Sequence, residues 1–391
     1  MLNPNTDIIC GCCSMSWEHF GIGFMMLARA IVGRMTDSPK IDHRFRLMSR
    51  LDEVRMWADT WRGKHKHASI HVLDRIGMLL FLLNGDFDST DPRDRLYAIL
   101  GISGAGASLA QWPGLTVSYE KTMTEVFRDL AITIMEDRKV LAILAGYDLK
   151  WRHSKALSDK PSWVPTWGFE DYCNLREMAL NRVGDTTGLR AIVRFSEDRN
   201  TLFAHGIEVG RIAVIGPQFI GGVGREVELG AQFKEWEAQM LGTATVLKRY
   251  DSSALAVQAW KTALTHAWDG MHMSADDLCY EYLMGRNTED IPWHTDYWRR
   301  VLALPAYLEN APKRFEHKRP LILDTGEISM AEGVDDVRLD DVLILFRGAP
   351  FPFILRQEGD HYTFLGNCFL EGRMNIPGEE AFVDAKEFAV R

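Results

Sequence analysis

Residues 90–101 read Thr-Asp-Pro-Arg-Asp-Arg-Leu-Tyr-Ala-Ile-Leu-Gly, and this stretch predicts the start of a helix. Pro92 has no backbone N–H to lose in a first helical turn, and Asp91 directly before it suits the N-cap position. An apolar stripe follows at helical spacing, formed by Leu96, Ile99 and Leu100. We therefore expect a helix that Asp91 caps and that Arg93 or Asp94 ties to the rest of the chain.

A second helix is expected directly after the segment Val117-Ser118-Tyr119-Glu120-Lys121. Thr122 and Glu125 have the spacing of a capping box, in which each side chain bonds the backbone N–H of the other residue. Helical spacing continues in the apolar residues Met123, Val126, Phe127, Leu130, Ala131 and Ile134. This pattern predicts a helix over residues 122–137.

Three further blocks combine tryptophan, proline, cysteine or glycine at short spacings. One lies near the start, where Ile9-Cys10-Gly11 is followed by Ser14-Met15-Ser16-Trp17. Another is Pro161-Ser162-Trp163-Val164-Pro165-Thr166-Trp167. The last lies near the C-terminus and comprises residues 340–348, 350–356 and 365–374.

Together the five blocks resemble the conserved segments of the fungal heterokaryon-incompatibility (HET) family, in the family's order along nearly the whole chain. Residues 90–101 are similar to its D-P-R-D-[KR]-x-Y-A-L-L-G signature. Residues 161–167 are similar to its P-S-W-V-P-D-W segment, with Thr166 where Asp is usual. The family's N-terminal core, which resembles TIR-like α/β domains, carries Y-x-A-L-S-Y-x-W-G and W-x-D-x-x-C-I-N-Q motifs that this sequence lacks. The resemblance therefore implies the C-terminal part of a HET protein, and we expect the chain to begin where that core ends.

Composition indicates a soluble globular protein with one large or two ordinary domains. The 391 residues are 46% hydrophobic and 25% charged, and no apolar run approaches the roughly 18 residues of a membrane helix. The net charge of −9 argues against a general nucleic-acid surface. Six cysteines are scattered without the spacing of a disulfide framework, which favours reduced thiols in a cytoplasmic protein.

The hydrophobic period changes near residue 190, which predicts an α+β protein. A helical half is expected to pack on a small, barrel-like antiparallel β-unit that carries a helical insertion. The expected parts are a helical half over 1–150, a linker with the PSWVPTW motif over 151–190, and a β-rich half over 191–391 with its insertion at about 230–310.

Two segments give the strongest strand signals in the β-rich half. Residues 191–195 and 201–205 flank a polar turn and predict a β-hairpin. Val342–Phe346 is apolar at every position, which predicts a strand that is buried on both faces.

No motif indicates a resident cofactor. The patterns G-x-G-x-x-G, G-K-[ST], G-x-S-x-G and H-E-x-x-H do not occur. His65, His67 and His71 lie close together in the sequence, but no cysteine or acidic residue follows at a matching metal-ligand spacing. We therefore expect no tightly bound metal, flavin or nicotinamide.

A ligand pocket is expected at the junction of the two halves, because such junctions commonly hold ligand sites. The candidate catalytic residues are Arg356, Glu371, Tyr97 and Tyr119. The candidate substrate-binding residues are Trp163, Trp167, Arg373 and Phe353. An alternative remains open in which Arg356 and Glu371 form a structural ion pair, since a buried arginine needs a partner.

Three classes of function are compatible with these patterns. The first, which we expect, is a cofactor-independent cyclase or isomerase of fungal secondary metabolism, which would act on a lipophilic polyketide or terpenoid through shape and a few hydrogen-bond donors. The second is a heterokaryon-incompatibility or regulatory protein that acts by protein binding, without catalysis. The third is a remnant with neither activity. We expect a lipophilic small-molecule substrate, no nucleic acid and no membrane span, and a homo-oligomer is compatible with the sequence.

Overall fold

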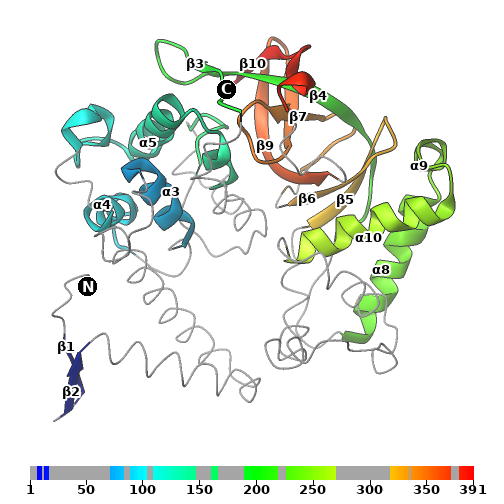
Figure 1. The fold of residues 1–391 in the computed structure, drawn as a ribbon, viewed down its shortest axis with the longest axis horizontal. Coiled ribbons are helices and arrows are strands. Elements are labelled where there is room, and N and C mark those ends of the chain that lie inside the picture. The colour runs from blue at the N-terminus through cyan, green and yellow to red at the C-terminus, as the bar shows by residue number, and fades with distance from the viewer. Residues whose placement is uncertain are drawn as a thin grey trace.

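A computed structural model provides the structure of the chain (Figure 1). The residues that it describes are 7–10, 13–16, 71–82, 89–103, 109–146, 160–165, 189–218, 226–269, 318–332, 334, 336–370 and 378–391.

Between residues 71 and 146 the described chain is helical, as its hydrophobic spacing predicts. The helices are α3 (Val72–Leu82), α4 (Arg93–Ile102) and α5 (Met123–Arg138), with short 3-10 turns at Leu109–Gln111, Pro113–Leu115 and Ala142–Gly146. The predicted capping box is present at the start of α5. The Thr122 hydroxyl accepts from the backbone N–H of Glu125, and the Glu125 carboxylate accepts from that of Thr122. The buried stripes of the three helices form one side of the larger hydrophobic core.

The N-terminal segment differs from the helical prediction for residues 1–150. Strands β1 (Asp7–Cys10) and β2 (Cys13–Ser16) pair antiparallel, with Asp7 opposite Ser16 and Cys10 opposite Cys13. The two connecting residues begin with Gly11, a residue type that is favoured in two-residue hairpin connections. Each strand has only four residues, which is too short for hydrophobic periodicity to separate a strand from a helix.

The β-rich half contains one large sheet whose strand pairings run in a ring. Its strands are β3 (Val193–Phe195), β4 (Leu202–Ile215), β5 (Lys318–Leu323), β6 (Ile328–Glu332), β7 (Val342–Phe346), β8 (Phe353–Glu358), β9 (His361–Leu370) and β10 (Lys386–Val390). Antiparallel ladders lead from β4 through β5, β6, β9, β8 and β7 and back to β4. β3 and β10 both pair with the first residues of β4, so the predicted hairpin is confirmed. The mixed α+β class is confirmed as well.

The long strand β4 takes part in four ladders because it bends. Register shifts between Glu208 and Gly210 and between Ile212 and Val214 mark β-bulges, which increase local twist and bend a strand. Gly206 lies where β4 begins to pair with β7. A Cβ atom at this position would lie 2.8 Å from the Leu345 carbonyl oxygen, so the close approach of the two strands requires glycine.

The sheet separates two hydrophobic cores, and β7 shows how. Successive side chains of a strand point to opposite faces. Val342, Ile344 and Phe346 belong to the larger core, which we call the outer core, and Leu343 belongs to a second cluster. All six ring strands contribute to that second cluster, so it lies on the enclosed face, and we call it the ring core. All five β7 residues are buried, which confirms the prediction of a strand buried on both faces.

Among the described residues, three helices lie between β4 and β5 in the chain. They are α8 (Glu226–Leu241), α9 (Ala244–Arg249) and α10 (Ser253–Asp269). α8 and α10 pack on the outer face of β5, β6 and β9 and bury Phe233, Trp236 and Trp260 there (Figure 1). Residues 270–310 of the predicted insertion lie outside the described residues.

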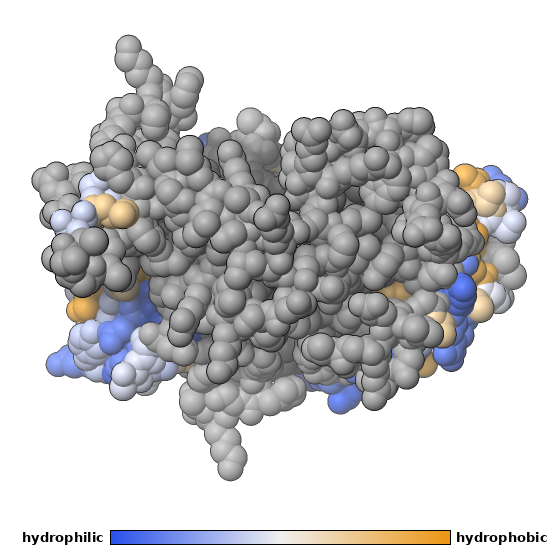
Figure 2. Space-filling model, turned by 90° about the horizontal axis from the view of Figure 1, so that it is seen from below, coloured by the Kyte–Doolittle hydropathy of each residue, from blue (hydrophilic) through white to orange (hydrophobic). Residues whose placement is uncertain are grey.

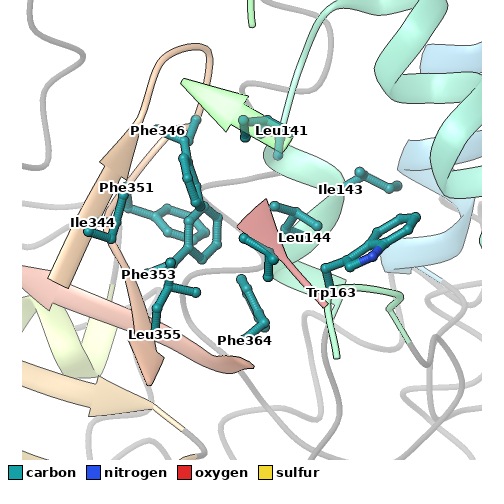
Figure 3. Packing of buried hydrophobic residues seen from close by; sticks show 14 of the residues in the cluster. Leu141, Ile143, Leu144, Trp163, Ile344, Phe346, Phe351, Phe353, Leu355 and Phe364 are labelled. Atoms are coloured by element: carbon teal, nitrogen blue, oxygen red, sulfur yellow. The ribbon is translucent and has the colours of Figure 1, made fainter. Parts of the chain in front are cut away.

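The helical half and the sheet are joined by backbone hydrogen bonds near Gly348. The Leu141 N–H donates to the Gly348 carbonyl oxygen at 3.0 Å, and the Ala191 N–H donates to that of Lys139 at 2.7 Å. Gly348 has a φ of 81°, and a Cβ atom there would lie 2.5 Å from the Ala191 nitrogen. Leu141 and Leu144 pack against the sheet beside these bonds (Figure 3). The two halves therefore share one continuous core.

Across the described parts of the chain, no helix is both long enough and apolar enough to cross a membrane.

Candidate functional site

The structure distributes the predicted site residues over three places instead of one pocket. Trp163 and Phe353 lie in the outer core, Arg356 lies at one end of the ring, and Tyr97 and Tyr119 lie beside α4. The remaining three candidates, Trp167, Glu371 and Arg373, lie outside the described residues.

Trp163 is a fully buried core residue at the junction of the two halves. Its indole N–H donates to the Asn200 carbonyl oxygen at 2.9 Å, and its ring centroid lies 5.4 Å from that of Phe195. Figure 3 shows it beside Ile143 and Leu144 of the helical half. The indole therefore has its polar atom satisfied and no exposed surface, as expected of a residue that packs across a junction.

Phe353 occupies the sheet side of the same core. Its ring centroid lies 5.5 Å from that of Phe351, 6.0 Å from that of Phe346 and 5.2 Å from that of Phe364 (Figure 3). The side chain is fully buried. In this arrangement its area stabilises the fold through aromatic packing.

The neighbour of Trp163 in the motif, Ser162, makes contacts that the sequence reasoning missed. Its hydroxyl accepts from the backbone N–H of Phe364 at 2.8 Å and donates to the Arg391 carbonyl oxygen. Lys160 donates to the carbonyl oxygen of Val164. The motif thus connects the helical half to β9 and to the residue that follows β10. The sequence feature that indicates these contacts is the serine hydroxyl between Pro161 and Trp163, to which the motif itself assigns no hydrogen-bond partner.

Arg356 is held by two aspartates. Its Nε and Nη2 atoms donate to the Asp341 carboxylate at 2.9 and 2.8 Å, and its Nη2 also donates to the Asp336 carbonyl oxygen at 2.6 Å. Its Nη1 donates to the Asp336 carboxylate at 3.3 Å. The hydrogen bonds that Arg356 donates to the Asp341 carboxylate raise the pKa of Arg356. Arg356 therefore forms an ion pair with Asp341 and Asp336. Glu371, the partner that the sequence suggested, lies outside the described residues, so the Arg356–Glu371 pair stays a prediction.

The alternation of side chains along β8 places Arg356 on the other face of the sheet from Trp163. Phe353 and Leu355 face the outer core, whereas Ile354 faces the ring core. Because strand side chains alternate, Arg356 lies on the Ile354 side. The structure therefore does not bring Arg356 and Trp163 to a shared pocket.

Tyr97 and Tyr119 form a pair that joins α4 to the segment before α5. The Tyr97 hydroxyl donates to the Ser118 carbonyl oxygen at 2.7 Å, and the Tyr119 hydroxyl donates to the Asp94 carboxylate at 2.5 Å. Their rings meet edge to face, with centroids 5.4 Å apart. The hydrogen bond to Asp94 raises the pKa of Tyr119. In Figure 1, α4 lies at the left, apart from strands β5, β6, β7 and β9 of the sheet.

Arg93 adds hydrogen bonds to the contact between the start of α4 and residues 118–121. We call this contact, formed by Asp91, Arg93, Asp94 and Tyr97 with residues 118–121, the α4 tie. Arg93 donates to the Tyr119 and Lys121 carbonyl oxygens at 2.8 and 2.7 Å and pairs with Asp91 at 2.6 Å. The Asp91 carboxylate also accepts from the backbone N–H of Arg93 at 2.9 Å. The helix begins at Arg93, with Pro92 at its N-cap position and no side-chain hydrogen bond from that residue. The side-chain hydrogen bond from Arg93 lowers the pKa of Asp91. The expected tie is confirmed, whereas the N-cap residue is Pro92 and not the predicted Asp91.

Within the described ranges, no group of three His, Cys, Asp or Glu side chains is arranged to hold a metal ion. His71 lies 3.8 Å from the Asp137 carboxylate and packs edge to face on Trp112. His65 and His67 lie outside the described residues.

Comparison with known proteins gives one significant relative among curated sequences. No protein-family model matches the chain, and no solved structure matches it. The relative is heterokaryon incompatibility protein 6, OR allele, of Neurospora crassa, which is 25% identical over 73% of this chain. The alignment covers 48% of the Neurospora protein, so the chain spans about half the length of the curated relative it matches. The comparison supports a relationship to the heterokaryon-incompatibility proteins that the five sequence blocks resemble.

Proposed function

We propose that this chain is a regulatory protein of the heterokaryon-incompatibility type that acts by binding another protein. The observation that carries the proposal is the use of the candidate catalytic groups. Arg356, Tyr97 and Tyr119 each direct their polar atoms to partners inside the fold. These contacts favour a structural role for them over a chemical one.

A catalytic donor has to be available to the charge that develops in a transition state. The Arg356 guanidinium has five N–H groups, and its four described contacts all go to Asp336 and Asp341. Tyr97 has only one hydroxyl proton, which the Ser118 carbonyl oxygen accepts. Using either group on a substrate would require breaking a contact that holds two segments together.

The cofactor-independent cyclase acting on a lipophilic substrate remains a prediction from the sequence. No contact among the described residues favours it over binding. The Neurospora relative, by its name, takes part in heterokaryon incompatibility and exists as an allele. This name supports the binding hypothesis, in which the chain affects the fate of fused cells that carry different alleles.

The test is expression of the chain in Neurospora crassa, with survival of fused and unfused hyphae measured by vital-dye exclusion. Tyr97→Phe is the informative variant because it removes the hydroxyl while keeping the ring. We expect expression of the chain to lower the survival of fused cells only. We expect a Tyr97→Phe variant whose melting temperature is unchanged to keep that effect. We also expect the same protein to co-purify with both versions from fused cells.

Two results would contradict the proposal. One is equal survival of fused cells with and without the chain. The other is a folded Tyr97→Phe protein that keeps its partner but loses the effect, together with conversion of a lipophilic metabolite by the unmodified protein. That second result would favour the cyclase.

A further inference from the structure

Tyr119 combines exposure with a defined chemical environment. Its relative exposure is 58%, and among the tyrosines that the structure describes it is the exposed one. It lies in a turn between two helical segments, where a modifying enzyme can reach it. The other large apolar residues that are exposed in the described parts of the chain are scattered. On the face in Figure 2, the described residues that are visible include both hydrophilic and hydrophobic types.

The Tyr119 hydroxyl is the point of the α4 tie that is most sensitive to charge. It donates its proton to Asp94 at 2.5 Å, and Asp91 lies three residues before Asp94, just ahead of α4. A phosphate on this oxygen would remove the donated proton and add a charge of about −1.5 to −2 beside the carboxylate. Attraction would be replaced by repulsion between like charges.

Arg93 is the nearby cation, and it is already engaged. Its guanidinium lies 5.3 Å from the Tyr119 ring centroid, pairs with Asp91, and donates to the carbonyl oxygens of Tyr119 and Lys121. To pair with a phosphate it would have to leave some of these partners. Both the repulsion from Asp94 and a move of Arg93 to the phosphate would weaken the contact between α4 and residues 118–121.

We infer that Tyr119 is a phosphorylation site whose modification opens the α4 tie. The phenolic oxygen attacks the γ-phosphorus of a nucleoside triphosphate, and the bond to the diphosphate leaving group breaks. The phenolic proton passes to the base of the kinase. This inference concerns the purified chain and is independent of the proposed function.

The experiment treats the purified chain with a broad-specificity tyrosine kinase, ATP and Mg²⁺, and maps the modified residues by mass spectrometry. Hydrogen exchange of the α4 amides is measured before and after treatment. We expect Tyr119 to be modified ahead of Tyr97, and exchange in α4 to become several-fold faster. Tyr119→Phe is the matched control and should show no change in α4 exchange after the same treatment.

Asp94→Asn tests the cause. Because it removes the repelled charge, phosphorylation of this variant should accelerate α4 exchange less than phosphorylation of the unmodified sequence. The inference is overturned if other tyrosines are modified and Tyr119 is not. It is also overturned if phosphorylated Tyr119 leaves α4 exchange unchanged or slows it, since Arg93 would then have re-paired with the phosphate and closed the tie.

Discussion

Two arginine–aspartate contacts in this protein have the same chemistry and different surroundings. Arg356 and Asp341 are 13% and 3% exposed at the end of the ring, whereas Arg93 and Asp91 are 23% and 29% exposed in the α4 tie. Both are charge-assisted pairs that use two guanidinium nitrogens. Burial decides how much the loss of each pair lowers the stability of the fold. Breaking a buried pair leaves a charge without water, whereas water replaces a lost partner at the surface.

The largest effect is expected from Asp341→Ala. This change leaves the Arg356 guanidinium largely buried with Asp336 as its described acid, and it should lower the free energy of unfolding by about 3 kcal/mol. Urea denaturation followed by circular dichroism measures the change. The double variant Asp341→Leu/Arg356→Met should be less destabilised than Asp341→Ala, because no unpaired charge remains. A double variant that is as unstable as the sum of its parts would show that burial is not the cause.

Arg93→Met is expected to have the next largest effect, and that effect should depend on salt. The variant loses the Asp91 pair and two hydrogen bonds to carbonyl oxygens between α4 and residues 118–121. In 1 M NaCl the Debye length is about 3 Å, so the difference in melting temperature between Arg93→Met and the parent should shrink. The difference caused by Asp341→Ala should stay nearly constant. Equal salt dependence of the two variants would refute the contrast.

A smaller effect of pH is expected at the α4 tie. The folded-state pKa of Asp91 is lowered, so its stabilising contribution is present above the ordinary aspartate pKa of about 4 and is lost as the pH falls through the lowered value. Hydrogen exchange in α4 should therefore accelerate below about pH 4 relative to exchange in β7, after correction for intrinsic rates. The Asp91→Asn variant should not show this relative acceleration.

The smallest effect is expected from Tyr119→Phe. It removes one exposed hydrogen bond to Asp94 and keeps the edge-to-face contact with Tyr97. Differential scanning calorimetry should show a shift in melting temperature smaller than that of Arg93→Met. If the shift matched that of Asp341→Ala, exposure would not be what separates the two contacts.

The sequence predicted elements that depend on local chemistry. The capping box of α5 needs two residues at a fixed spacing, and the β3–β4 hairpin needs a polar turn between two apolar runs. The Arg356 partner depends on strand register instead. Val342 lies opposite Leu355, and this register continues to place Asp341 beside Arg356. Nothing in the sequence near Arg356 or Asp341 shows that register, so the sequence did not predict Asp341 as the partner of Arg356.

The division of the site candidates has a similar cause. Trp163, Arg356 and Tyr97 come from blocks that lie far apart in the chain, and no pattern within those blocks shows that the three side chains lie on different faces. Alternation along β8 turns Arg356 away from the outer core. The α4 tie was easier to predict, because residues 90–101 carry Asp91 and the charged first turn that form it.

The closed ring of strands has a consequence for how the chain folds. β4 ends at residue 215, and its ring partners begin only at residues 318 and 342, so closure joins segments about a hundred residues apart. The contacts within α3, α4 and α5 are far more local. Folding rates fall as contacts become less local, so the helical half should form first and the closing ladder should limit the rate. The entropy of closing a flexible loop grows only with the logarithm of its length. Lengthening the chain between β4 and β5 should therefore slow folding only slightly.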